Sequence, residues 1–205
     1  YTCLSWIFGA FLGDSLGGHC EFMPSSLFNH NKIYTNERFQ NGQTTDDSEM
    51  AISKAFAIMD MSDINNLDQN LIFYYYGIWI FSMPLDQGFT TSSALHNFRI
   101  QTMPINSQNL FTNEIKKTIA IQNCNSKANG GLMRLSTLIT WFYYKNKVEI
   151  KNILKSKNSK KFFELYGKIY LEVAKDFEIT HPNKENIVSG SLLTFMTLCT
   201  MNQYK

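Results

Sequence analysis

Residues 44–59 read TTDDSEMAISKAFAIM, and no other stretch of the chain indicates its secondary structure as clearly. Apolar side chains after the threonines recur at a spacing that places them on one face of a helix: Met50, Ile52, Ala55, Phe56 and Met59. Thr44 or Thr45 suits the N-cap position, and the carboxylates of Asp46 and Asp47 complement the helix dipole. We therefore predict a helix that ends in the polar stretch Asp60–Asp68.

The same helical spacing recurs along most of the chain. Further helices are predicted over Leu71–Ser82, Ser92–Arg99, Asn113–Gln122, Leu132–Tyr144, Phe163–Phe177 and Lys184–Tyr204. The short alternating segments that an all-β domain needs do not appear. We expect an all-α fold, a single orthogonally packed helical domain that extends over residues 1–205.

The composition excludes several classes of protein. Hydrophobic residues make up 44% of the chain and aromatic residues 14%, which is enough for a core and argues against disorder. The net charge of +2 gives no strong attraction to nucleic acid, so no such partner is expected. The apolar run Leu71–Met83 is shorter than the roughly 20 residues that a membrane helix needs, and we predict no membrane association. Lys145–Lys161 is predicted to be a solvated loop. We also expect the protein to be a monomer.

The cysteines are Cys3, Cys20, Cys124 and Cys199. They are far apart in the sequence and form no Cys-x-x-Cys pair, so a zinc site or a dense disulfide framework is not expected. A reducing compartment is the simpler explanation, and we predict a cytoplasmic location.

Thr45, Asp46 and Asp47 have two interpretations. They can simply cap and charge the start of a helix. They also place a hydroxyl and two carboxylates on one turn, and such hard oxygen ligands suit Mg²⁺ or Mn²⁺. Both interpretations stay open on these residues alone.

Glycines recur every four residues near the N-terminus, at Gly9, Gly13 and Gly17. On a helix they would share one face, and we predict that another element packs closely against it. Their order matches neither a dinucleotide-binding loop nor a P-loop. Close packing explains these glycines but not Asp14 and Glu21, which stand in an otherwise apolar frame.

Two polar segments precede predicted helices farther along the chain. Residues 125–134 read NSKANGGLMR, a turn whose free backbone N–H groups suit a phosphate or a ribose, although an ordinary loop and cap would look similar. Thr180-His181-Pro182 precedes the last helix, and a lone histidine is by itself uninformative.

Taken in order, these segments resemble the motifs of the ADP-ribosylglycohydrolase family. That family includes the dinitrogen-reductase-activating glycohydrolases and the ADP-ribosylarginine and ADP-ribosylserine hydrolases. A fifth match falls within Tyr76–Leu95, at Trp79, Ser82, Pro84, Asp86, Gly88, Thr90, Thr91, Ala94 and Leu95. The resemblance covers nearly the whole chain. It implies an all-α, metal-dependent hydrolase that removes ADP-ribose from modified protein side chains by breaking the bond at ribose C1″.

The resemblance also implies roles for individual residues. Two Mg²⁺ or Mn²⁺ ions would be held in part by Thr45, Asp46 and Asp47. Glu21 and Asp86 match acidic positions with proposed catalytic roles. Contacts with the diphosphate and riboses of an ADP-ribosylated protein or of ADP-ribose would come from Gly88, Asn125, Ser126, Asn129, Gly130 and His181.

Two departures from the family pattern qualify this expectation. Ser48 replaces the commoner threonine but keeps a hydroxyl. The family's C-terminal Gly-Asp-x-Asp-Thr/Ser block, which supplies the remaining metal ligands, has no match before Lys205. We therefore expect the natural chain to be longer. The alternative is a catalytically inactive member that binds ADP-ribose or serves a structural role.

Overall fold

The computed structural model describes residues 2–29, 31–32, 34–35, 38–96, 98, 109–156 and 158–201, without the side chains of residues 2–4. Within these ranges every regular element is a helix, which confirms the all-α prediction. The α-helices are α1 (Thr2–Gly17), α2 (Asp46–Met59), α3 (Gln69–Phe81), α4 (Phe89–Leu95), α5 (Asn113–Asn123), α6 (Leu135–Ser156), α7 (Ser159–Phe177) and α8 (Lys184–Met201). Short 3-10 helices are η1 (Gly18–Cys20), η2 (Ser25–Leu27) and η3 (Asn129–Gly131).

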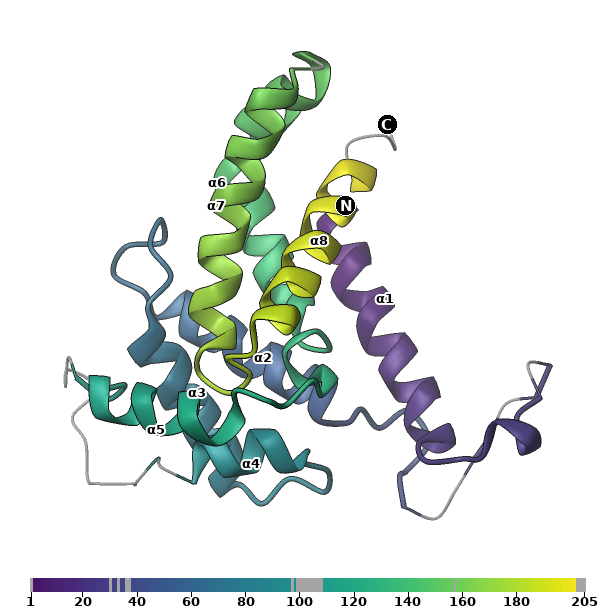
Figure 1. Cartoon of the computed structure of the whole chain (residues 1–205). Helices are drawn as coiled ribbons and strands as arrows, with labels where there is room; N and C mark the ends of the chain where they lie inside the picture. Colours follow the sequence, from purple (N-terminus) through teal and green to yellow (C-terminus); the bar gives the residue numbers. More distant parts are fainter. Residues whose placement is uncertain are drawn as a thin grey trace.

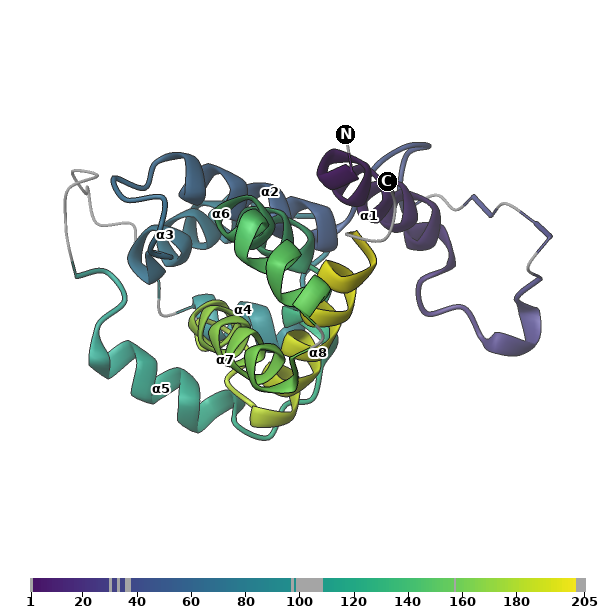
Figure 2. The same cartoon turned by 90° about the horizontal axis from the view of Figure 1, so that it is seen from above.

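Helices α2 and α3 pack against each other along their lengths, as do α7 and α8. Figure 1 shows α6 and α7 standing side by side, with α8 and α1 beside them and α3, α4 and α5 below. The view from above places α2 and α3 on one side of α7 and α5 on the other (Figure 2). The core between these layers contains Met50, Ile72, Phe73, Tyr76, Leu95, Ile119, Leu138, Ile139, Ile169 and Phe177.

Helix α3 covers most of the apolar run Leu71–Met83, where a helix was predicted over Leu71–Ser82. Asp68 caps it by accepting hydrogen bonds from the backbone N–H groups of Asn70 and Leu71. Ile72 and Tyr76 are completely buried in the core. Among the described residues, no helix combines the length and the apolar character that crossing a membrane requires.

The lysine-rich segment Lys145–Lys161 was predicted to be a loop, and this prediction was wrong. Helix α6 continues to Ser156 through a local distortion at Asn146, and α7 begins at Ser159 after an Asn158 cap. Ile150 and Ile153 are buried among the lysines and asparagines of this stretch. They give the distal part of α6 one apolar face, which packs in the core against α7.

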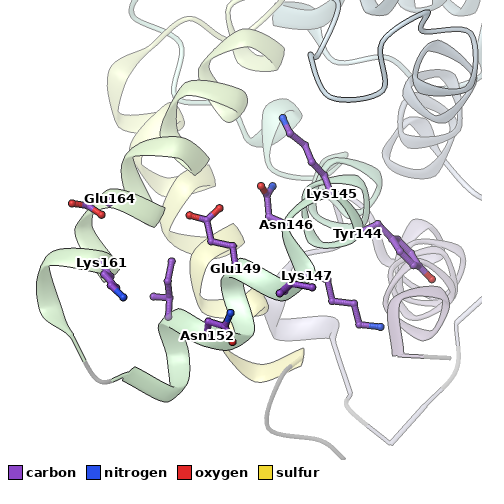
Figure 3. A pocket seen from close by; sticks show the side chains of 10 residues that line it. Tyr144, Lys145, Asn146, Lys147, Glu149, Asn152, Lys161 and Glu164 are labelled. Carbon is purple, nitrogen blue, oxygen red and sulfur yellow. The ribbon is translucent and has the colours of Figure 1, made fainter.

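The distal parts of α6 and α7 also line a cavity of about 600 Å³. Figure 3 shows charged and amide side chains around it, among them Lys145, Glu149, Asn152 and Lys161. None of the predicted site residues lines this cavity.

Other expectations differ from the structure in detail. Helix α4 begins at Phe89, three residues before the predicted start, and Arg99 lies outside the described residues. The α1 glycines do lie on a helix, but a Cβ atom on Gly9 or Gly13 would meet nothing within 4 Å, so no described residue packs closely there. The described thiols of Cys20, Cys124 and Cys199 are free.

Candidate active site

The N-terminus of α2 is capped by a side chain from another helix. Thr45 occupies the N-cap position, but its side chain does not cap α2. Instead Asp14 of α1 accepts hydrogen bonds from the backbone N–H groups of Thr45 (3.0 Å) and Ser48 (3.1 Å). It also accepts from the hydroxyls of Thr45 (2.6 Å) and Ser48 (2.5 Å). Asp14 therefore fixes the turn that carries Asp46 and Asp47. The apolar residues that surround Asp14 in the sequence gave no sign of this role.

Replacing Asp14 by alanine is expected to lower the free energy of unfolding by about 2–3 kcal/mol, because the N-terminal turn of α2 loses a charged acceptor. Urea unfolding followed by circular dichroism measures the change. The control is Asp68→Ala, which removes the ordinary cap of α3 at an expected cost of about 1 kcal/mol. Equal losses in the two variants would contradict the special role of Asp14.

Asp46 and Asp47 lie within a cluster of carboxylates. Burial is the main cause that raises the pKa of Asp46 to about 6, and the negative charges of Asp86 and Asp47 add to it. A hydrogen bond from the Gly88 backbone opposes this rise. Burial and the charge of Asp14 likewise raise the pKa of Asp47. The start of α2 is thus also a site of concentrated negative charge.

Glu21 and Asp86 meet at the edge of this cluster, although 65 positions (86 − 21) separate them in the sequence. Burial, a hydrogen bond with Asp86 and the repulsion of that carboxylate raise the pKa of Glu21 to about 7. Arg38 pairs with both, at 2.7 Å from Asp86 and 3.5 Å from Glu21. Sequence reasoning missed Arg38, which lies in a polar segment without a recognisable motif.

The segments that carry these two acids have unusual backbone conformations. Phe22, next to Glu21, has a φ of 59°, and Met83, three residues before Asp86, has a φ of 53°. Left-handed conformations are unfavourable for residues other than glycine, and they concentrate at functional sites. Both side chains are exposed, so burial of the side chain does not explain either conformation.

Apart from Gly88, the predicted substrate-binding residues gather around η3. Gly130 packs so closely that a Cβ atom would lie 2.5 Å from Cε1 of His181 and 3.2 Å from Oγ1 of Thr91. His181 is buried, and its Nδ1 lies 2.8 Å from the Thr180 hydroxyl. Burial lowers the pKa of His181 to about 3, so the imidazole is neutral. Asn125 and Asn129 are exposed on the same turn.

Two buried asparagines that were not predicted hold this turn in place. Asn186 of α8 donates to the carbonyl oxygens of Ser126 (3.1 Å) and Ala128 (3.2 Å). Asn123 of α5 donates to those of Thr90 and Thr180, both at 2.9 Å. The loop before η3 is therefore attached to α4, α8 and the segment before His181.

The start of α4 joins the acidic cluster to the η3 turn. The backbone of Gly88 forms a hydrogen bond with Asp46. The Thr90 hydroxyl lies 2.7 Å from the Ser126 hydroxyl. Thr91 lies against Gly130. The predicted metal ligands and the predicted substrate-binding residues thus belong to one continuous region.

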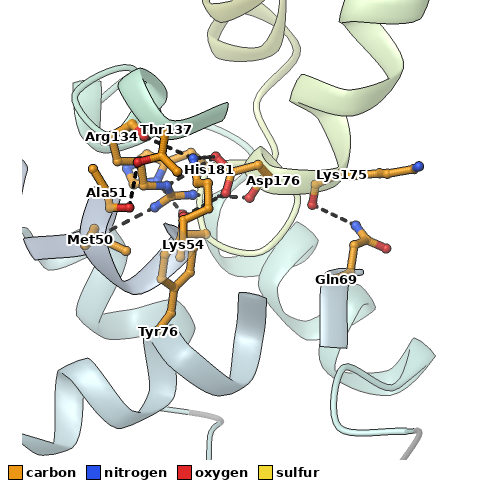
Figure 4. A network of polar contacts seen from close by, with 11 residues as sticks. Met50, Ala51, Lys54, Gln69, Tyr76, Arg134, Thr137, Lys175, Asp176 and His181 are labelled. Carbon is orange, nitrogen blue, oxygen red and sulfur yellow. Dashed lines mark hydrogen bonds and ion pairs between the residues drawn. The ribbon is translucent and has the colours of Figure 1, made fainter. Parts of the chain in front are cut away.

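A buried charge network underlies this region (Figure 4). Lys54 Nζ donates to Asp176 Oδ2 (2.9 Å) and to the Arg134 carbonyl (3.0 Å). Arg134 Nε contacts the same carboxylate oxygen at 3.4 Å, and the Tyr76 hydroxyl donates to Asp176 Oδ1 at 2.8 Å. All four side chains are completely buried. The network ties α2 and α3 to the end of α7 and to Arg134, three residues after η3.

Replacing Lys54 by methionine is expected to change how stability depends on pH. Burial lowers the pKa of Lys54 from its usual 10.5 to about 8, despite the opposing charge of Asp176. Between these values the unfolded chain binds the proton and the folded protein does not. This residue therefore makes wild-type stability rise with pH, by at most about 1.4 kcal/mol per pH unit.

The measurement is the free energy of unfolding of wild type and Lys54→Met from pH 7 to pH 10. The free energy of unfolding of the wild type is expected to increase relative to that of Lys54→Met as the pH rises. Lys168→Met, which alters an exposed lysine, is the control and should show a constant difference. If the difference in free energy of unfolding between wild type and Lys54→Met were also constant with pH, the lowered pKa of Lys54 would be refuted.

Comparison with known proteins assigns the fold to a family. The family model for ADP-ribosylglycohydrolase matches residues 3–204. The chain belongs to the ADP-ribosylglycohydrolase family. A protein of Acanthamoeba polyphaga mimivirus named "Putative ADP-ribosyl glycohydrolase L543" is 31% identical over 191 residues, which cover 87% of this chain and 49% of that relative. The chain thus spans about half the length of this relative.

The donor set of this ADP-ribosylglycohydrolase chain fits a hard divalent cation. Asp46 and Asp47 present carboxylates beside the Thr45 hydroxyl. Burial is the main cause of their raised pKa values, and the charges of neighbouring carboxylates, which a cation would offset, add to it. Within the described ranges, however, no group of three or more His, Cys, Asp or Glu side chains could hold a metal ion. The triplet fits the metal as part of a ligand set.

Proposed function

We propose that this region hydrolyses the bond between ADP-ribose and a protein side chain, with a divalent cation held by Thr45, Asp46 and Asp47. The observation that carries the proposal is the junction at the start of α4. It places the acidic cluster beside the Gly130 and His181 region in a chain of this family.

The η3 turn is suited to the diphosphate and ribose part of the substrate. The first N–H groups of a helical turn have no partner within the helix, and they attract anions. The missing side chain of Gly130 leaves space for the His181 imidazole, whose Nδ1 lies 2.8 Å from the Thr180 hydroxyl. A neutral imidazole can then hydrogen-bond a ribose hydroxyl through Nε2.

The acidic cluster is suited to the chemical step. When bound, the cation polarises ribose hydroxyls and lowers the pKa of water. Glu21 or Asp86 accepts a proton from the attacking water or from the 2′-hydroxyl. The water oxygen forms a bond with C1″ as the bond to the protein side chain breaks. That side chain recovers a proton and ADP-ribose leaves.

The test incubates the protein with two substrates, one ADP-ribosylated on arginine and one on serine, and measures free ADP-ribose by chromatography. Release with Mg²⁺ or Mn²⁺ that stops on addition of a chelator is the expected result. Binding of ADP-ribose by calorimetry without any turnover would contradict the hydrolase and indicate a binding role.

A further inference from the structure

Arg38 bridges the two acids to which the catalytic roles are assigned. Its guanidinium lies 2.7 Å from Oδ1 of Asp86 and 3.5 Å from Oε2 of Glu21. The three side chains come from different segments: the turn after η1, the stretch between η2 and α2, and the loop between α3 and α4. The Asp86 side chain is 13% exposed and that of Arg38 is 42% exposed. The bridge therefore lies at the solvent edge of the acidic cluster.

Aromatic rings hold the guanidinium in this position. Its central carbon lies 4.9 Å from the centre of the Phe39 ring and 6.0 Å from that of Phe22. Phe39 is buried, and it packs edge-on against His19, with 6.4 Å between the ring centres. The position of Arg38 is thus set by a side chain that is anchored in the fold.

The positive charge of the Arg38 guanidinium has two opposite consequences for Glu21 and Asp86. It relieves the repulsion between Glu21 and Asp86, which otherwise adds to the charges of Asp46 and Asp47. The guanidinium also occupies one carboxylate oxygen of each acid and adds positive charge close to both carboxylates. A divalent cation that approaches the same carboxylates must overcome this charge.

We propose that Arg38 is a built-in counter-ion that competes with a divalent cation for the acidic cluster and so weakens metal binding by the protein. Arg38 acts through Glu21 and Asp86 and is a positioning residue. The inference rests on the proposed metal site, and it adds a residue that adjusts the affinity of that site.

The first experiment measures Mn²⁺ binding by calorimetry at pH 7.5 for wild type, Arg38→Gln and Arg38→Lys. Removal of the charge in Arg38→Gln is expected to lower the Kd for Mn²⁺ by about three- to tenfold. Arg38→Lys keeps the charge and should stay closer to wild type. Lys168→Gln is the matched control, since it removes an equal charge from the exposed ion pair with Glu149 and should leave the Kd unchanged.

An unchanged or higher Kd in a folded Arg38→Gln protein overturns the competition while leaving the metal site intact. Absence of Mn²⁺ binding in every variant at millimolar concentration overturns the metal site itself, and the competition with it. The two failures are therefore distinguishable.

A second experiment tests the bridge without metal. Melting temperatures are measured in a chelator for wild type, Arg38→Gln, Asp86→Asn and the double variant. Arg38→Gln is expected to lower the melting temperature of the wild type more than that of Asp86→Asn, because the ion pair is already absent there. Equal shifts in both backgrounds would show that the two side chains do not interact, and would overturn the inference.

Discussion

Asp176→Asn is expected to lower the free energy of unfolding by about 3–5 kcal/mol, because it leaves buried cations without their counter-charge. The Asp176 carboxylate accepts from Lys54 and Tyr76 and contacts Arg134, and none of these side chains is exposed. The charges of Arg134 and Lys54 lower the pKa of this carboxyl group below its usual value, although burial opposes them. Urea unfolding monitored by circular dichroism gives the free energy of each variant.

The matched control is Glu178→Gln, two residues farther along the chain. Glu178 is exposed and accepts one hydrogen bond from Gln69, at 3.2 Å, so its loss should change stability by less than about 1 kcal/mol. Adding Lys54→Met to Asp176→Asn should restore part of the lost stability, since one uncompensated charge is then removed. A loss in Asp176→Asn no larger than in Glu178→Gln would mean that the network does not support the fold.

Asp46→Asn is expected to reduce kcat for ADP-ribose release by at least about 100-fold, because the cation loses a charged ligand and with it several kcal/mol of transition-state stabilisation. The Mn²⁺ affinity should fall in parallel. In a chelator the variant should be at least as stable as wild type, because Asp46 lies beside Asp47 and feels the charge of Asp86. Chromatography of the released ADP-ribose, calorimetry with Mn²⁺ and urea unfolding measure the three quantities.

Glu114→Gln is the control for this substitution. Glu114 also lies in the first turn of a helix, at the start of α5, but it is not part of the cluster of Glu21, Asp46, Asp47 and Asp86. It should leave kcat unchanged. Wild-type turnover in Asp46→Asn would exclude Asp46 as a metal ligand, whereas lost turnover together with lost stability would point to a structural role.

The fold class and most helices were predictable because helical periodicity is a local property of the sequence. The apolar spacing after Asp46 and along α7 marked both helices correctly. The prediction failed between Lys145 and Ser156, where frequent lysines concealed the buried Ile150 and Ile153. It also failed for the α1 glycines, since spacing alone does not reveal whether another element lies close by.

The sequence by itself determined the family motifs, including the acidic triplet and the Gly130 and His181 segments. Tertiary structure alone decided which side chains meet. Asp14 caps a helix 31 positions away, and Lys54 reaches Asp176 across 122 positions. Arg38 contacts Asp86 across 48. Charge interactions act over a few ångströms in space, and only the packing of the helices brings such distant residues within that range.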